Sequence, residues 1–256
     1  MNIHSSAIVN PGAELGEDVE IGPHTIIEND VIINEGTKIA SNVLLASGTR
    51  IGKNCTIHHG AVLGTLPQDL KFGGEKTTLE IGENTTIREY ATLNRGTKDH
   101  WKTEVGNNCL LMAYSHVAHD CVLGNNVIIA NSVNMAGHVT IEDFVGIGGL
   151  APIHQFVKIG KHTFIGGGYR VPKDVPPFIL AMGEPLKFGG LNTIGLQRRG
   201  FDSNTIMLIK KAYKILYRSN LIVKEALQKI EEEVEQVDEV KYLVSFIRNS
   251  ERGLIR

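Results

Sequence analysis

The sequence predicts a mainly β protein, a parallel β-helix of hexapeptide repeats that is followed by a small C-terminal α-helical domain. Two observations lead to this fold class. Aliphatic residues recur at every sixth position over the first two thirds of the chain, and a helical periodicity replaces them near the C-terminus. We therefore expect residues 1–190 to form the β-helix and residues 191–256 to form the helical domain.

The six-residue period runs from Ile3 to Val171 and places an aliphatic residue at 26 of 29 positions. A chain that is 42% hydrophobic would fill about 12 of these positions by chance. Such repeats are typical of parallel β-helices, in which three hexads complete one triangular coil and residues eighteen apart stack. The position two residues before each aliphatic one is small or branched, and it holds all three cysteines, Cys55, Cys109 and Cys121.

Two polar stretches interrupt the period, at residues 64–78 and 94–103. They contain the three positions where the aliphatic residue is missing, and we expect both to loop out from the β-helix. Long loops on a rigid scaffold are a favoured place for function. After Val171 the sequence becomes a connection rich in Pro and Gly, and from Asp202 onward it predicts three helices, the last two over about 221–235 and 238–249.

Composition and charge argue against several classes of protein. A net charge of -2 gives no overall basic field for binding nucleic acid. The first residues lack the pattern of a signal peptide and no stretch is apolar enough to span a membrane, so we expect a cytoplasmic protein without a membrane span. The cysteines are odd in number and lack CxxC spacing, which argues against a disulfide framework or a cysteine-based zinc site.

The candidate chemistry lies on one edge of the predicted β-helix. A histidine can act as a general base near neutral pH, and an adjacent carboxylate fixes its tautomer. A glycine one coil away offers an unobstructed backbone N–H, which suits the oxyanion of an acyl transfer. Stacking eighteen residues apart predicts two columns with these groups, one of His119, Gly137 and Gln155 and the next of Asp120, His138 and Phe156.

Other interpretations of these residues are open at this point. The histidines can be exposed turn residues, and Gly137 can be a corner that requires positive φ. Three histidines on a β-helix can also hold zinc, and His116 and His154 lie beside the two columns. We expect no metal, because acyl transfer also accounts for Gly137 and the first loop. No dinucleotide, P-loop or serine-hydrolase motif is present in the sequence.

The chain closely resembles the UDP-N-acetylglucosamine O-acyltransferase family, which catalyses the first step of lipid A synthesis. The resemblance extends over essentially the full length, and the order and spacing of its segments are far more specific than any one hexapeptide. The matching segments are PQDLKFGGE (67–75), NRGT (94–97), HVAHDC (116–121), AGHV (136–139), HQF (154–156), KDVPP (173–177), GLNTIGLQRRGF (190–201), AYKILYRS (212–219) and the terminal RGLIR.

The resemblance implies a homotrimer of left-handed β-helices with active sites between neighbouring subunits. It implies transfer of a (3R)-3-hydroxyacyl group from acyl carrier protein, with its phosphopantetheine, to the glucosamine 3-position, without any further cofactor. By this resemblance His119 is the general base, Asp120 orients it, and the Gly137 amide binds the oxyanion. The sugar attacks the thioester directly, so no acyl-enzyme is expected.

The resemblance also implies roles for residues outside this core. The residues similar to the family's substrate contacts are Gln68, Asp69, Lys71, His116, His138, His154, Gln155, Asn192, Arg198 and Arg199. Gly167 lies where the family has its acyl-chain ruler, and without a side chain there we predict a long acyl chain. The basic cluster is expected to attract acyl carrier protein; its members are Lys210, Lys211, Lys214 and Arg218.

Two positions depart from the family pattern. Better-known members often carry His where this chain has Asn94 and an acidic residue where it has Ile194. Because some relatives acylate a 3-amino analogue of the sugar, N-acylation is the alternative activity. The later N-acyltransferase of the pathway is a further alternative, but it usually has an N-terminal uridine-binding domain, whereas here the hexads begin at Ile3. A non-catalytic β-helix scaffold is the alternative outside enzymes.

Overall fold

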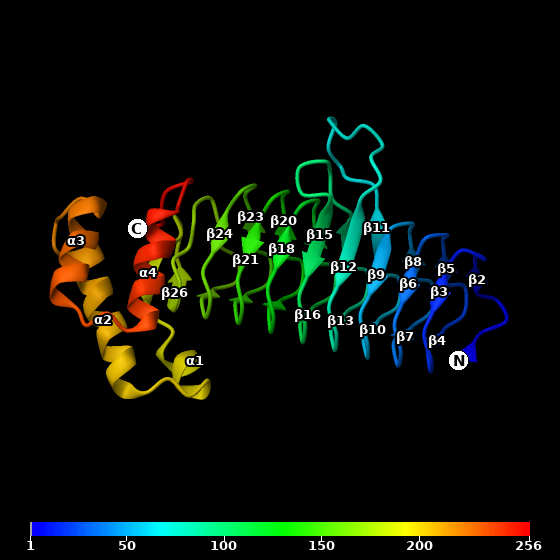
Figure 1. Ribbon diagram of the computed structural model, residues 1–256, viewed down its shortest axis with the longest axis horizontal. Coiled ribbons are helices and arrows are strands. Elements are labelled where there is room, and N and C mark those ends of the chain that lie inside the picture. The colour runs from blue at the N-terminus through cyan, green and yellow to red at the C-terminus, as the bar shows by residue number, and fades with distance from the viewer. Residues whose placement is uncertain (1) are drawn as a thin grey trace.

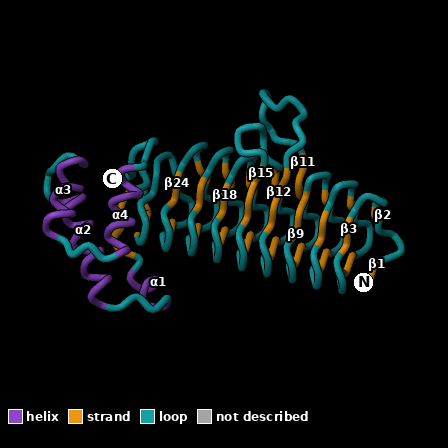
Figure 2. Tube along the Cα trace, viewed as in Figure 1, coloured by secondary structure: helices purple, strands orange, loops and turns teal. Residues whose placement is uncertain are grey.

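The computed structural model describes residues 2–256 and shows a long prism of stacked coils with a cluster of helices at one end (Figure 1). Strands lie only in the prism and its final hairpin, and helices lie only beyond it (Figure 2). The predicted fold class, a parallel β-helix of hexapeptide repeats followed by an α-helical part, is confirmed.

The prism has three faces, which we call sheets A, B and C. Sheet A contains β1 (Asn2–Ile3), β4 (Glu20–Ile21), β7 (Lys38–Ile39), β10 (Thr56–Ile57), β13 (Thr86–Ile87), β16 (Leu110–Leu111), β19 (Ile128–Ile129), β22 (Gly146–Ile147), β25 (Phe164–Ile165), β26 (Ile179–Met182) and β27 (Lys187–Leu191). Sheet B contains β2 (Ile8–Val9), β5 (Ile26–Ile27), β8 (Leu44–Leu45), β11 (Val62–Thr65), β14 (Thr92–Asn94), β17 (His116–Val117), β20 (Asn134–Met135) and β23 (Pro152–Ile153). Sheet C contains β3 (Glu14–Leu15), β6 (Ile32–Ile33), β9 (Thr49–Ile51), β12 (Thr78–Ile81), β15 (Lys102–Val105), β18 (Val122–Leu123), β21 (Thr140–Ile141) and β24 (Lys158–Ile159).

The register between coils confirms the predicted stacking. His116 pairs with Asn134, which pairs with Pro152, so partners are eighteen residues apart. Across the two loops the spacing grows by whole hexads: Thr56 pairs with Thr86 and Thr92 pairs with His116. The loops therefore add two hexads and one hexad, which are the three positions where the aliphatic period fails.

The core is the aliphatic column that the period predicted. The inward residues of the middle coils are almost fully buried, and so are the three cysteines at the small inward position. Ile3 is 41% exposed, because no coil covers the N-terminal end of the stack. At the corners the second turn residue has positive φ, both for Asn and Asp as expected and for larger residues such as Tyr114 and Phe156.

The C-terminal part has four helices rather than the three predicted. They are α1 (Thr193–Arg198), α2 (Ser203–Arg218), α3 (Val223–Glu233) and α4 (Asp238–Arg248). Asp202 caps α2 as expected, because its side chain accepts a hydrogen bond from Thr205 N. The segment expected to be a plain Pro/Gly connection contains β26 and β27, an antiparallel pair that extends sheet A.

Side-chain contacts fasten the helices to the last coils. The Tyr242 hydroxyl of α4 donates to the Glu142 carboxylate, and Lys161 Nζ lies 3.9 Å from the centre of the Tyr242 ring. Asp174 is fully buried and accepts hydrogen bonds from Ser250 Oγ and Lys158 N. Over residues 2–256, no helix has the length and apolar character that crossing a membrane requires.

Candidate active site

One corner of the prism, between sheets B and C, collects most of the predicted site residues. His119 and Asp120 form the turn between β17 and β18, and Gly137 and His138 form the next turn, between β20 and β21. The His138 N–H donates to His119 O, so the two turns stack directly. Both insertions also leave from this corner, because each connects a strand of sheet B to a strand of sheet C (Figure 1).

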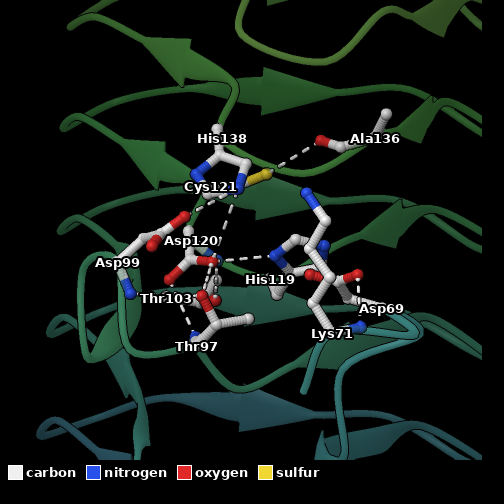
Figure 3. Close-up of polar contacts among 10 residues, drawn as sticks. All are labelled: Asp69, Lys71, Thr97, Asp99, Thr103, His119, Asp120, Cys121, Ala136 and His138. Atoms are coloured by element: carbon white, nitrogen blue, oxygen red, sulfur yellow. Dashed lines mark hydrogen bonds and ion pairs between the residues drawn. The ribbon is translucent and has the colours of Figure 1, made fainter.

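His119 and Asp120 form a hydrogen-bonded pair. His119 Nδ1 lies 2.8 Å from Asp120 Oδ2, and the Asp120 side chain is fully buried while that of His119 is 12% exposed (Figure 3). Burial opposes ionisation of Asp120, but hydrogen bonds from His119 and Thr97 outweigh it and lower its pKa to about 2. Asp120 is therefore a carboxylate at neutral pH, so it accepts a hydrogen bond from the N–H at His119 Nδ1 and leaves Nε2 as the ring nitrogen available to act as a base.

Thr97 and Thr103 hold the carboxylate in place, and reasoning from the sequence alone missed both roles. Thr97 donates twice to Asp120, from its backbone N to Oδ1 at 2.8 Å and from Oγ1 to Oδ2 at 2.7 Å. Asp120 N in turn donates to Thr103 Oγ1 at 2.8 Å. Both threonines belong to the predicted loop at 94–103 and are buried. The signal for Thr97 was the match of NRGT (94–97) to the family segment, and Thr103, which lies in β15, occupies the small inward position two residues before Val105.

Gly137 lies against the His119 ring. A Cβ at this position would lie 2.5 Å from His119 Cε1 and 2.7 Å from Nε2, so only glycine leaves room for the ring. The interpretation that Gly137 needs positive φ is wrong, because the positive φ of this corner belongs to His138. Glycine is required here by close approach and not by backbone conformation.

The Gly137 amide is also free of a protein partner. At the same hexad position, some turn N–H groups donate to a side chain of the next coil, as Asn107 N does to Asn125 Oδ1 and Asn125 N does to Asp143 Oδ1, whereas others, such as those of Asn131 and Gln155, have no such acceptor in the described chain. In the described chain, from Asn2 to Arg256, Gly137 N–H has no such acceptor. A buried N–H without a partner is costly, so an oxygen atom of a ligand would be bound favourably there.

The other histidines of the corner surround the pair. The His138 ring stacks on Phe156 with centroids 4.5 Å apart and meets the His119 ring edge to face at 5.1 Å. His116 Nδ1 lies 2.7 Å from Thr92 Oγ1. Burial lowers the pKa of both His116 and His138, so both are predominantly neutral at pH 7. His154 and Gln155 are exposed in the turn of the next coil.

The first loop carries Gln68, Asp69 and Lys71 above the same corner. Asp69 is half-buried and accepts a hydrogen bond from Lys71 N at 3.0 Å (Figure 3). Gln68 and Lys71 are exposed. The base of this loop is held by Asn94, which is only 3% exposed and donates to Thr65 Oγ1 and Leu66 O. Asn94 is thus buried beneath the loop.

The remaining predicted residues lie at other corners of this chain. Asn192 caps α1 and donates to His162 O, and Arg199 donates to Phe144 O, so both lie at the corner between sheets C and A. Arg198 is exposed at the end of the same helix. Gly167 is exposed at the corner between sheets A and B. A single chain does not bring these four residues to His119.

The histidines do not group as the zinc interpretation required. Among the residues that the structure describes, the group with ligand atoms close enough to share an ion is His119, Asp120 and His138, and it includes neither His116 nor His154. The arrangement offers an imidazole, a carboxylate bonded to it and an open N–H donor, groups of the kind that can serve the attack of a hydroxyl group on an acyl carbonyl.

Comparison with known proteins supports the same chemistry. A family model described as UDP N-acetylglucosamine O-acyltransferase, domain 2, matches residues 174–255, and one for bacterial transferase hexapeptide repeats matches residues 30–65 and 102–137. The chain is 59% identical over 257 residues to the acyl-(acyl-carrier-protein)-UDP-N-acetylglucosamine O-acyltransferase of Aquifex aeolicus, covering 100% of this chain and 98% of the relative. It is 56% identical to the relative of the same name from Trichlorobacter lovleyi, covering 100% of both chains.

Solved structures agree over the full length. A UDP-N-acetylglucosamine acyltransferase from Bacteroides fragilis superposes with a TM-score of 0.98 at 48% identity, covering 99% of this chain and all of that chain. A related structure from Acinetobacter baumannii gives a TM-score of 0.97 at 44% identity over the whole of both chains. With its hexapeptide prism, its helical end and these relatives, the chain belongs to the acyl-(acyl-carrier-protein)-UDP-N-acetylglucosamine O-acyltransferase family.

Proposed function

We propose that the protein transfers a (3R)-3-hydroxyacyl chain from acyl carrier protein to the 3-hydroxyl of UDP-N-acetylglucosamine, the first step of lipid A synthesis. The observation that carries the proposal is the order Asp120, His119, Gly137 at one corner, with a carboxylate, a free imidazole Nε2 and an open N–H in sequence. We infer the two substrates, acyl-acyl carrier protein and UDP-N-acetylglucosamine, from the names of the relatives in the family.

The reaction follows from these three groups. His119 Nε2 takes the proton of the sugar hydroxyl as its oxygen attacks the thioester carbonyl, and Asp120 stabilises the imidazolium that forms. The Gly137 N–H donates to the carbonyl oxygen as it becomes an oxyanion. Collapse of this intermediate breaks the C–S bond, and the His119 proton goes to the phosphopantetheine thiolate. No acyl-enzyme forms, because the sugar oxygen itself attacks the carbonyl carbon.

The donor protein is acidic in this proposal, and the helical part offers a basic surface for it. Lys210, Lys214 and Arg218 line a groove with Phe188 and Tyr213, between α2 and β27. Their cationic heads attract an acidic partner, and the aromatic floor suits the apolar part of its prosthetic group. We propose that Lys211, on the same helix, adds to this field.

A homotrimer is proposed for two reasons. Asn192, Arg198, Arg199 and Gly167 lie away from His119 within one chain, so a neighbouring subunit must bring their equivalents to the site if they contact substrate. The outer faces of sheets A and B also carry exposed apolar side chains, including Ile8 at 59%, Ile128 at 43% and Phe164 at 44% exposure. Such faces on a rigid prism favour packing against another copy.

The choice of O-acylation over N-acylation rests on the family. The two departures from the family pattern, Asn94 and Ile194, lie in different surroundings: Asn94 is buried under the first loop, and Ile194 is 65% exposed on α1. Because Asn94 donates hydrogen bonds to Thr65 and Leu66, its presence in place of His affects how the loop is supported.

We propose that residues 1–190 perform the transfer and residues 191–256 receive the donor.

The test is a transfer assay with purified protein, hydroxyacyl carrier proteins of several lengths, and either UDP-N-acetylglucosamine or its 3-amino analogue. We expect the hydroxyl sugar to be preferred, and His119→Ala to lower turnover by a factor on the order of 10² to 10⁴ with the oligomer intact. Preference for the amine would show N-acylation by the same site. Activity of His119→Ala within a few-fold of wild type would remove the base from the mechanism and favour a scaffold.

A further inference from the structure

We propose that the corner holding His119 also binds a divalent transition-metal ion, and that the bound ion inhibits the transfer reaction. The inhibition rests on the proposed function, because it depends on His119 being the base. The binding of the ion does not depend on that function and can be measured separately.

The ligand atoms are already assembled. One ligand atom from each of His119, Asp120 and His138 lies within 4.8 Å of the other two. His119 Nδ1 and Asp120 Oδ2 are 2.8 Å apart, and His138 Nε2 is 3.8 Å from Oδ2. Ligands of a tetrahedral ion with bonds of about 2.0–2.1 Å are roughly 3.3 Å apart, which falls between these two distances.

Asp99 supplies a fourth ligand that the proposed transfer mechanism does not use. Its Oδ2 lies 3.8 Å from His138 Nε2, and its side chain is 61% exposed, so it can move toward an ion without leaving a packed environment. In Figure 3 Asp99 points from the second loop toward the His138 ring, on the same side as Asp120. Two imidazoles and two carboxylates form a set that zinc and cobalt accept and that magnesium, which prefers oxygen ligands, does not.

Occupancy would disable the base directly. An ion bound at His119 Nδ1 displaces the proton that Nδ1 otherwise donates to Asp120. Neutral imidazole then carries its single proton on Nε2, the atom that faces Gly137. A protonated Nε2 cannot accept the proton of the sugar hydroxyl, so the metal-bound protein is inactive while its fold is unchanged.

Titration of metal-free protein with Co²⁺ tests the binding, using visible absorption as the readout. We expect one ion per chain with the absorption of a tetrahedral site, and transfer activity that falls in step with occupancy. Asp99→Asn should weaken Co²⁺ binding at least tenfold while leaving transfer without metal within a few-fold of wild type. The matched control is Glu35→Gln, which removes an exposed carboxylate paired with Lys53 and should change neither quantity. Mg²⁺ should not inhibit.

The outcomes separate the two proposals. No Co²⁺ absorption up to millimolar concentration would overturn the metal site, as would binding that His138→Asn leaves unchanged. Full transfer activity of the Co²⁺-saturated protein would overturn the inhibition. Absence of transfer in metal-free wild type, with Co²⁺ still bound as expected, would instead count against the proposed function.

Discussion

The hydroxyl of Thr97 offers a sharp test of how the Asp120 carboxylate, which we propose orients the base, is held. Thr97→Val keeps the shape of the side chain and its backbone N–H but removes the 2.7 Å hydrogen bond to Asp120 Oδ2. Hydrogen bonds to charged groups contribute about 1.5–3 kcal/mol. We expect turnover to fall about tenfold, which corresponds to about 1.4 kcal/mol, because Asp120 then orients His119 less well. The Michaelis constants should change little, since Thr97 is buried away from solvent.

The same variant should change the pH dependence of stability. The pKa of Asp120 is lowered from 3.8 to about 2, because hydrogen bonds to its charged form outweigh the cost of burial. A lowered pKa stabilises the fold above pH 3.8 by about 2 kcal/mol, and this contribution disappears as the pH falls from about 4 to 2. Thr97→Val should therefore lower the free energy of unfolding at pH 7, and its difference from wild type should shrink below pH 4.

Steady-state rates at saturating substrates and urea unfolding at pH 7 and pH 3 measure the two effects. Thr97→Ser is the matched control, because it keeps the hydroxyl and should retain turnover within about twofold. If Thr97→Val has wild-type turnover and the same unfolding free energy as Thr97→Ser at both pH values, the hydrogen bond has no role in holding Asp120.

Two further predictions concern glycines of the prism. Gly137→Ala places a Cβ 2.5 Å from His119 Cε1, so the His119 ring must move. We expect the transfer rate to fall by a factor on the order of 10² or more, while the circular dichroism spectrum stays unchanged. Activity near that of wild type would contradict the close approach. Gly167→Met adds a side chain at the exposed corner proposed as the chain ruler, and it should shift preference to shorter acyl donors. An unchanged chain-length profile in a competition assay would refute that role.

The repeat made most of the prism predictable. One side chain in six must enter a narrow aliphatic column, so the period is visible in the sequence. Because residues eighteen apart stack, the sequence also predicted that His119, Gly137 and His138 lie at one corner. The hairpin of β26 and β27 and the short helix α1 were missed. Both lie where Pro and Gly are frequent and where side chains do not fill the aliphatic column at regular intervals. Neither a six-residue nor a helical period is therefore present to reveal them.

The site was predictable only where its members share the register. Thr97 reaches Asp120 from a loop whose path no period describes, so its role depended on three-dimensional structure. Thr103 lies in β15 at the small inward position, where the period predicts burial but not a hydrogen bond to Asp120 N. Gly137 was singled out from the sequence for two reasons, its unobstructed backbone N–H and a corner that requires positive φ. The role of its amide as the oxyanion donor stays a prediction, whereas the alternative explanation by positive φ is wrong, because at this corner the residue with positive φ is His138.

The two insertions leave the prism at one corner and return to adjacent strands, adding whole hexads to two coils. The coils above and below stack as though the insertions were absent. The hexads carry the fold and also the turns that hold His119, Asp120 and Gly137, while the insertions add further side chains, among them Asp69 and Thr97, at the same corner. A change of length or sequence at the tip of an insertion would alter what is bound without changing the register of any coil. Specificity can therefore change on this β-helix at little cost to folding.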